Sequence, residues 1–203
     1  MGTITPDLEA PIGTATSFKW KEALFSSTAQ ANGWLETFQY TIDESVYNNL
    51  IYLFENVIQP ARNWQGSGIR INSGYRHPRT NAAVGGSSTS QHMTGMAADI
   101  TVGEGNAALY FWMRDNLVYD QLIWEYGDDT NPRWIHVSVK SVGTNRMQVF
   151  SIPSGNLPNS PAATAMPVSQ SRSVGVRNKL LVNTFLVWYI TFALVNRLRG
   201  IFI

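Results

Sequence analysis

The segment 87–101 constrains the fold most strongly, because it combines two residue types that bind metals with a run of small residues. His92 and Asp99 stand seven positions apart in it, and Ala97 and Ala98 directly precede the aspartate. Small side chains let the neighbouring backbone pack closely around a bound ion. We therefore expect this segment to form part of a buried site, and the rest of the chain to supply its surroundings.

A third residue able to bind a metal, His136, follows in the apolar run 134–137. Two imidazoles and one carboxylate make a three-ligand set that suits a catalytic zinc ion, whose fourth position stays open to water. We therefore predict that His92, Asp99 and His136 bind Zn²⁺. A histidine and an aspartate at this spacing are a weak signal on their own, so the surrounding motifs decide how the set is interpreted.

Three motifs occur in order along the chain. Ser-Gly-Tyr-Arg stands at 73–76, Ser-Gln-His-Met-Thr-Gly-Met-Ala-Ala-Asp at 90–99, and Trp-Ile-His at 134–136. Across about residues 17–151 the chain resembles the zinc D-Ala-D-Ala carboxypeptidase family of peptidoglycan peptidases. Within that family it is most similar to the small single-domain branch of phage endolysins. The resemblance implies a zinc metallopeptidase that hydrolyses peptide bonds in peptidoglycan stem peptides, as a carboxypeptidase or an endopeptidase.

The same resemblance implies roles for two residues in the motifs. Arg76 is expected to contact a carboxylate or carbonyl oxygen of the substrate near the metal, since a guanidinium binds planar oxyanions in a bidentate manner. A structural salt bridge is the alternative for this arginine. Ser90 is expected to bind the substrate or to orient the loop before His92.

Peptide hydrolysis also needs a carboxylate that takes a proton from water and passes it to the leaving amine. We predict that Glu125 is this base, because its strand leads through a turn into the strand of His136, so both side chains can face one site. Trp124 and Tyr126 flank it and predict an apolar surrounding, which raises the pKa of a carboxyl group.

The chain departs from the family pattern at Arg133, where several members carry the acid three positions before the last histidine. An arginine cannot act as that base. Other branches place the base on the preceding strand, as predicted for Glu125. Asp128 and Asp129 remain alternatives, and a surface carboxylate without a catalytic role remains the alternative for Glu125.

Hydrophobic periodicity predicts an α+β fold with a small, mainly antiparallel sheet flanked by helices. This is also the hedgehog- and DD-peptidase-like fold that the resemblance implies. A capping box at 41–44 opens the clearest helix, Pro60 is expected to kink or end it, and 121–126 with 134–139 predicts an antiparallel hairpin. The expected helices are 41–63, a short one from Pro78 to before Gly85, and 106–116, and the expected strands are 69–72, 97–102, 121–126, 134–139 and 146–152.

Composition divides the chain into four parts. Residues 1–16 are rich in Pro, Gly and Thr and predict an extended arm, and 17–152 form the predicted zinc peptidase domain. Residues 153–177 contain four prolines and no acidic residue, which is typical of a linker. Residues 178–203 are predicted to form a hydrophobic C-terminal helix that acts as an anchor.

The predicted anchor contains 16 mostly apolar, uncharged residues at 180–195. At about 1.5 Å per residue a helix of this length spans roughly 24 Å, which is less than the roughly 30 Å of a bilayer core. Three interpretations stay open. The helix is a short membrane anchor, it binds a capsid or other partner protein, or it packs on its own domain.

Charge is distributed unevenly. Residues 1–129 carry 7 basic and 14 acidic side chains, a net −7, and residues 130–203 carry 8 basic and no acidic side chains, a net +8. A basic tail favours anionic lipid or wall polymer, or is merely solvated. We expect no specific nucleic-acid partner. There is no cysteine, which excludes disulfides and thiolate zinc sites.

The N-terminus has no basic segment followed by an apolar one, so we expect no secretory signal peptide. A catalytic domain joined through a linker to an apolar helix predicts a virion-associated or membrane-anchored phage protein. The alternative function is an anchored structural or binding protein that retains the zinc-peptidase fold without catalysis.

Overall fold

The computed structural model describes residues 2–152 and 164–165. The chain divides into two compact units, Met1–Met166 and Pro167–Ile203, and all described residues belong to the first. The predicted C-terminal helix lies outside the described residues. Within the described part, no helix is both long enough and apolar enough to cross a membrane.

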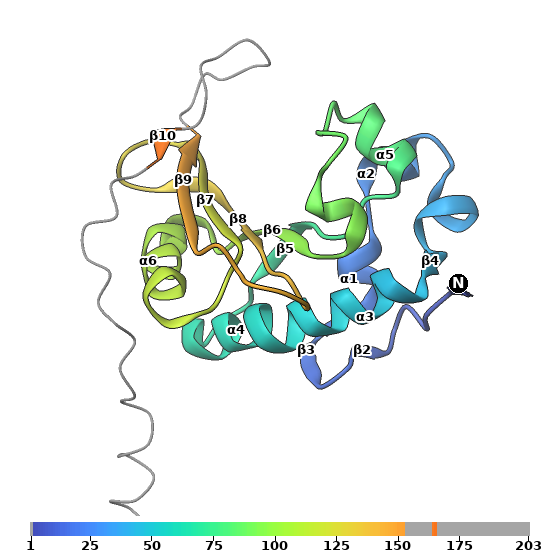
Figure 1. Cartoon of the computed structure of the whole chain (residues 1–203), viewed down its shortest axis with the longest axis horizontal. Coiled ribbons are helices and arrows are strands. Elements are labelled where there is room, and N and C mark those ends of the chain that lie inside the picture. The colour runs from blue at the N-terminus through green and yellow to red at the C-terminus, as the bar shows by residue number, and fades with distance from the viewer. Residues whose placement is uncertain (1, 153–163, 166–203) are drawn as a thin grey trace, which may run out of the picture. The chain divides into compact units, whose positions relative to one another are not determined.

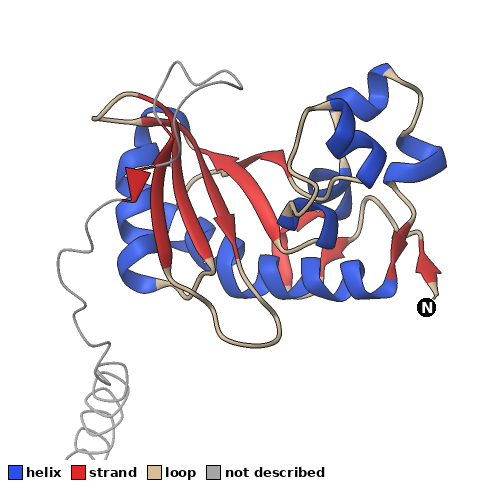
Figure 2. Cartoon of the chain, turned by 45° about the horizontal axis from the view of Figure 1, so that its top comes forward, coloured by secondary structure: helices blue, strands red, loops and turns tan. Residues whose placement is uncertain are grey.

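A six-stranded sheet forms the centre of the first unit (Figures 1 and 2). Its strands follow the order β10-β9-β7-β8-β6-β5. The pair β7–β9 is parallel, and the other neighbouring pairs of described strands are antiparallel. This confirms the predicted α+β class. The strands are β5 (Arg70–Ser73), β6 (Ala97–Thr101), β7 (Gln121–Gly127), β8 (Pro132–Ser138), β9 (Gln148–Ile152) and β10 (Thr164–Ala165).

The two faces of the sheet differ because successive side chains of a strand point to opposite sides. On one face Ile100, Leu122 and Val137 are fully buried in the main hydrophobic cluster, and α6 (Asn106–Asn116) packs against β7 and β8. The opposite face, called the open face below, is only partly buried. Strand register places on it Asp99 of β6, Trp134 and His136 of β8, Gln121, Ile123 and Glu125 of β7, and Gln148, Phe150 and Ile152 of β9.

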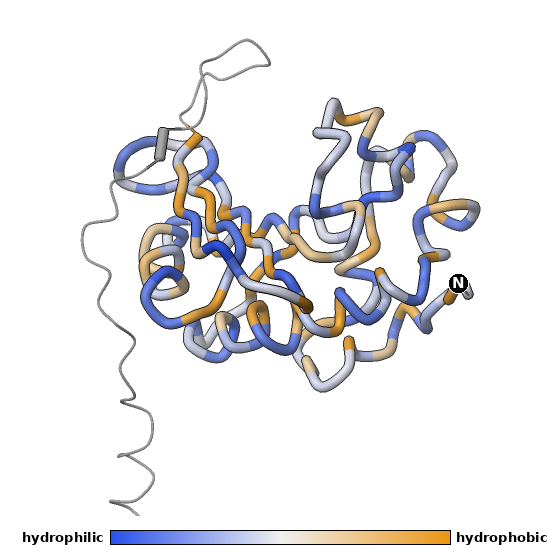
Figure 3. The backbone as a smooth tube through the Cα atoms, in the orientation of Figure 1, coloured by the Kyte–Doolittle hydropathy of each residue, from blue (hydrophilic) through white to orange (hydrophobic). Residues whose placement is uncertain are grey.

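The long helix predicted at 41–63 begins three residues later than expected. It consists of α3 (Glu44–Leu53), a π-helical turn (Phe54–Ile58) and α4 (Gln59–Gln65). The predicted capping box is wrong, because Ile42–Asp43 form strand β4, which pairs with β1 (Thr3–Ile4). Figure 3 shows hydrophobic and hydrophilic segments alternating along this helix, as expected for a helix with one side in the core.

Pro60 is the second residue of α4 and does not end the helix, which continues to Gln65. A proline cannot donate to the carbonyl four residues before it, and its ring clashes with that carbonyl in a regular α-helix. The wider π-helical turn directly before α4 is where the helix departs from regular geometry. The helix therefore continues past Pro60, with the π-helical turn directly before α4.

The remaining elements are short, and most of them lie beside the sheet, near its edge strand β5 (Figure 2). Strands β2 and β3 pair as an antiparallel ribbon, so part of the predicted N-terminal arm is built into the fold. The boundaries predicted at residues 16 and 152 stay predictions. The elements are β2 (Pro11–Ile12), β3 (Ala15–Lys19), α1 (Trp20–Leu24), α2 (Ser27–Ala31), a π-helical turn (Leu35–Gln39), α5 (Pro78–Ala83) and 3-10 turns at Gln91–Thr94 and Gly103–Gly105.

Candidate metal centre

His92 lies on the 3-10 turn Gln91–Thr94 and is almost fully buried, with 1% of its surface exposed. Its Nδ1 is 2.7 Å from the carbonyl oxygen of Gly74. A carbonyl only accepts, so Nδ1 carries the hydrogen and Nε2 keeps its lone pair. A ligand histidine is commonly oriented by such a bond from its other nitrogen. The Ser-Gly-Tyr-Arg motif therefore fixes the ring of the histidine in the second motif.

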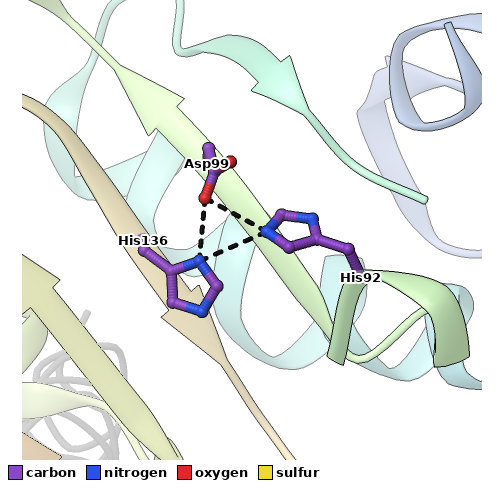
Figure 4. Close-up of side chains that lie close together, drawn as sticks. All are labelled: His92, Asp99 and His136. Atoms are coloured by element: carbon purple, nitrogen blue, oxygen red, sulfur yellow. Dashed lines mark hydrogen bonds and ion pairs between the residues drawn. The ribbon is translucent and has the colours of Figure 1, made fainter. Parts of the chain in front are cut away.

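Asp99 and His136 are direct partners across the antiparallel pair β6–β8, and both point to the open face. Asp99 Oδ1 lies 2.8 Å from His136 Nδ1 and 3.2 Å from His92 Nε2. The two imidazole nitrogens are 3.3 Å apart. Figure 4 shows the three side chains converging on one point.

One ligand atom from each of His92, Asp99 and His136 lies within 4.8 Å of the other two. The structure therefore brings together the three predicted ligands. They could hold a metal ion, with His92 contributing Nε2 and His136 contributing Nδ1. His92 comes from a 3-10 turn, and Asp99 and His136 come from two paired strands.

The protonation of the group follows from burial and from its one carboxylate. Burial alone would raise the pKa of Asp99, but the charges and hydrogen bonds of the two histidines outweigh it and hold that pKa far below its usual value. Burial lowers the pKa of His92. Burial would do the same to His136, but the hydrogen bond and charge of Asp99 raise its pKa instead.

Arg76 follows β5, which pairs with β6 on the side away from β8. Its backbone N–H donates to the carbonyl oxygen of His92 over 3.1 Å. The Nη2 atom is 3.6 Å from Asp99 Oδ2, and the buried Nε atom has no hydrogen-bond partner among the described residues. A guanidinium with unused donors beside the metal group can bind an oxyanion of a ligand.

Glu125 lies on the open face of β7, where strand pairing puts it beside Trp134 of β8. Trp134 Nε1 donates to Glu125 Oε2 over 2.7 Å. Burial, then the negative charge of Asp99, raises the pKa of Glu125. Trp124 points into the core on the other face, so the apolar contact comes from Trp134, the cross-strand partner.

The peptidase M15 family model matches residues 17–138, more than half of the chain. The chain belongs to the peptidase M15 family. The match covers all three motifs, the three predicted metal ligands and Glu125. Membership supports a peptidase, and so makes a peptide the class of substrate. No curated protein matches the chain.

The other predicted residues of this M15 chain are not members of the metal group. Ser90 directly precedes the 3-10 turn of His92, is partly buried, and makes no side-chain capping bond. Asp128 accepts bonds from Thr130 and Asn131 within the β7–β8 loop, and the Thr130 bonds lower its pKa most. Its neighbour Asp129 is exposed. Glu125 remains the predicted base.

His77 does not join the metal group. Its Nδ1 accepts from the backbone N–H of Arg79, so its side chain caps the start of α5.

Sequence reasoning missed Gln39, which is fully buried in this M15 fold. Its Nε2 donates to the carbonyl oxygens of Leu24 at 3.0 Å and Tyr75 at 2.7 Å. Its Oε1 accepts from the N–H of His77 at 3.2 Å and the hydroxyl of Thr80 at 3.0 Å. Gln39 thus holds the backbone on both sides of Arg76. A single polar residue between Phe38 and Tyr40 gave no signal of this role in the sequence.

Sequence reasoning also missed Asp120, whose side chain is fully buried. It accepts from Arg146 Nε at 2.9 Å, from Lys140 Nζ at 3.0 Å and from Gln91 Nε2 at 3.2 Å. Gln91 directly precedes His92. Asp120 therefore connects the metal-binding turn to the segment after β8.

Proposed function

We propose that this chain is a zinc metallopeptidase that hydrolyses peptide bonds in peptidoglycan stem peptides. The observation that carries the proposal is the convergence of His92, Asp99 and His136 on the open face of the sheet. Family membership supports a peptidase, and the ligand types support zinc, which binds histidine nitrogen and carboxylate oxygen in catalytic sites.

The spacing of the three ligand atoms fits a zinc ion. With zinc–ligand bonds of about 2.0–2.2 Å, two ligands of a tetrahedral site lie roughly 3.3–3.5 Å apart. The three separations here are 2.8, 3.2 and 3.3 Å. His92, Asp99 and His136 would therefore be close enough to hold one ion together, and the open face beside them is only partly buried.

The residues around the ligands supply the other parts of a hydrolysis. When bound, zinc supplies a Lewis acid that polarises the scissile carbonyl and makes water more acidic. Glu125, with its raised pKa, accepts a proton as the water oxygen bonds to the carbonyl carbon. It returns that proton to the amine nitrogen as the carbon–nitrogen bond breaks. The guanidinium of Arg76 binds a carboxylate or the developing oxyanion of the substrate.

Mass spectrometry of purified peptidoglycan fragments incubated with the full chain tests the proposal. We expect cleavage with zinc and none after treatment with a chelator. Loss of a single alanine would identify a carboxypeptidase, and release of a longer stem fragment would identify an endopeptidase. Intact fragments in the presence of protein with confirmed bound zinc would refute the proposal and favour an anchored, non-catalytic protein.

The role of Glu125 is tested by Glu125→Gln, which keeps the size of the side chain and removes its basicity. We expect bound zinc to remain and kcat to fall by about 10²- to 10⁴-fold. Glu104→Gln is the matched control, because Glu104 is exposed on a separate 3-10 turn. Equal activity of the two variants would rule out Glu125 as the base.

We also propose, from the sequence alone, that residues 178–203 tether the enzyme to a membrane or to a partner protein such as a capsid. The support is the apolar run at 180–195, flanked by basic residues on both sides. Deletion of 178–203 should release the protein from membranes or particles. Continued association of the shortened chain would contradict the tether.

A further inference from the structure

Arg79 follows Arg76 on the chain and lies over two aromatic rings. Its Cζ atom is 5.4 Å from the centroid of the Trp34 ring and 4.8 Å from that of Phe38. Phe38 also stacks with the imidazole of His77, with ring centroids 5.5 Å apart and an interplanar angle of 28°. Of the arginines that the structure describes, Arg79 alone contacts two rings in this way. We call Trp34, Phe38, His77 and Arg79 the aromatic cluster.

Two segments that are far apart in the chain meet in this cluster. Trp34 and Phe38 are one turn apart at the π-helical turn Leu35–Gln39, since the Phe38 N–H donates to the carbonyl oxygen of Trp34 over 3.0 Å. His77 and Arg79 stand at the start of α5, where His77 Nδ1 accepts from the Arg79 N–H. The two aromatic residues thus come from one segment and the two cationic side-chain types from the other.

Gln39 fixes the cluster next to the metal centre. It directly follows Phe38, and its buried side chain bonds to the backbone on both sides of Arg76. The N–H of Arg76 in turn donates to the carbonyl oxygen of His92. Three extended residues span at most about 11 Å, so the Cα atoms of Arg76 and Arg79 are no farther apart than that. One extended ligand can therefore reach both arginines.

The polar groups of the cluster have donors that the fold does not use. Within residues 2–152 and 164–165, the exposed guanidinium of Arg79 forms no hydrogen bond and no ion pair. His77 Nδ1 accepts a bond, so the neutral ring carries its hydrogen on Nε2, which has no partner in the same part of the chain. Burial, then the charge of Arg79, lowers the pKa of His77 against a weaker opposite effect of Asp43, so the ring is neutral at pH 7.

Unused donors on an aromatic base are suited to a carboxylate. A guanidinium can donate two parallel bonds to a carboxylate. Its contact with two rings restricts its motion before a ligand arrives, which lowers the entropic cost of binding. Glu36 lies between Trp34 and Phe38 in the chain, but it is exposed and forms no ion pair with Arg79 in the described part of the chain. The charge of Arg79 is therefore available to a ligand.

We infer that the aromatic cluster binds a carboxylate of the stem peptide that lies apart from the cleaved bond, with Arg79 as its main donor. This inference rests on the proposed function, because it takes the class of substrate from there. A stem peptide with lysine as its third residue carries two carboxylates, one at its C-terminus and one on the α-carbon of its γ-linked D-glutamate. The cluster binds the second of these. It thereby distinguishes stem peptides in which this group is free from those in which it is an amide.

The length of the substrate agrees with this assignment. Two residues separate the D-glutamate from the D-Ala-D-Ala bond, an extended length of roughly 7 Å to which the flexible glutamate chain adds. A peptide whose terminal group is bound by Arg76 can therefore place its glutamate carboxylate at Arg79.

Two peptides that differ in one charge test the inference. Acetyl-L-Ala-γ-D-Glu-L-Lys-D-Ala-D-Ala is prepared with the α-carboxylate of glutamate free or as its amide. The zinc-loaded full chain with Glu125→Gln, which should bind without cutting, is titrated with each peptide by isothermal titration calorimetry. If that chain still cuts, kcat/KM of the two peptides is compared instead. We expect Kd to be about fivefold lower for the free carboxylate, a modest factor because the site is exposed. The preference should decrease in about 1 M salt, where charges are strongly screened.

Arg79→Gln in the same chain should remove the preference. Arg114→Gln is the matched control, because Arg114 is also exposed and lies over an aromatic ring, Phe111, but stands on α6, which packs on the other face of the sheet. Arg79→Lys should retain part of the preference, since lysine keeps the charge and loses the two parallel donors. A melting curve shows whether each variant is folded. If Arg79→Gln is not, Arg79→Lys decides, and its preference should be smaller than that of the unchanged arginine.

Four outcomes overturn the inference. They are no detectable binding of either peptide, equal Kd for the two, tighter binding of the amide, and a preference that the Arg79 variants leave unchanged. Failure of the inference alone would leave zinc-dependent cleavage of peptidoglycan by the wild-type chain intact. Failure of the proposed function would instead appear as uncut peptidoglycan with zinc bound, whatever the ratio of the two Kd values.

Discussion

Gln39→Ala is expected to destabilise the fold and to loosen Arg76. The side chain is fully buried and makes four hydrogen bonds, at 2.7 to 3.2 Å. Each buried bond contributes about 0.5–1.5 kcal/mol net, so the four together contribute roughly 2–6 kcal/mol. Water that enters the vacated space would recover part of this, and we expect a loss of about 3 kcal/mol.

Urea unfolding of the full chain measures this loss directly. In a thermal melt it corresponds to a decrease in Tm of roughly 6–12 °C for a domain of this size. Gln30→Ala is the matched control, because it is the same substitution at an exposed position of α2. We expect the free energy of unfolding of that control to stay within about 0.5 kcal/mol of the wild-type value.

Activity at a temperature where both variants are folded separates positioning from stability. Two of the four bonds go to the backbone on either side of Arg76, so its guanidinium should be less well placed for the substrate. We expect KM to rise more than kcat falls, which is the pattern for a lost contact that is made before the transition state. A free energy of unfolding equal to that of Gln30→Ala, with an unchanged KM, would refute the reasoning.

Three further predictions concern the metal centre and its supports. Removing zinc with a chelator should lower Tm, since an ion at 100 times its Kd contributes about 2.7 kcal/mol; an unchanged Tm would mean that no ion had been bound. Gly74→Ala should lower the free energy of unfolding by about 1–3 kcal/mol, because a Cβ there would lie 2.3 Å from the carbonyl oxygen of Ala23. It should also weaken zinc binding, because the carbonyl of Gly74 orients His92. A variant with the Tm and the zinc affinity of the wild type would contradict this prediction. Asp120→Asn should lower the free energy of unfolding by about 2–3 kcal/mol at pH 7. Burial would raise the pKa of Asp120, but bonds from Arg146 and other cations depress it, so this contribution is present above the ordinary carboxyl pKa of about 3.9 and disappears as the pH falls toward the folded-state value. Urea unfolding of wild type and Asn variant should therefore converge as the pH falls below about 4, and a difference independent of pH would contradict this prediction.

Much of the local structure follows from the sequence. Helix α6 has the predicted bounds, and the hairpin β7–β8 forms where strand patterns and a turn-rich loop predict it. Both depend on the spacing of apolar residues, which is a local property. The predicted start of the long helix was wrong. Ile42–Asp43 pair with Thr3–Ile4 as strands, so residue 42 lies outside the helix. A partner 38 or more positions away in the chain is invisible to a local pattern.

The motifs by themselves determined which residues are candidate ligands, since few side chains bind zinc and the three motifs occur in order along the chain. The tertiary structure decided what surrounds them. Strand register gives Glu125 its contact with Trp134 instead of Trp124, because neighbours along a strand point to opposite faces and neighbours across strands share one. Packing likewise decided that Gln39 supports Arg76, since hydrogen-bond partners of a buried side chain depend on which segments meet and not on their order in the chain.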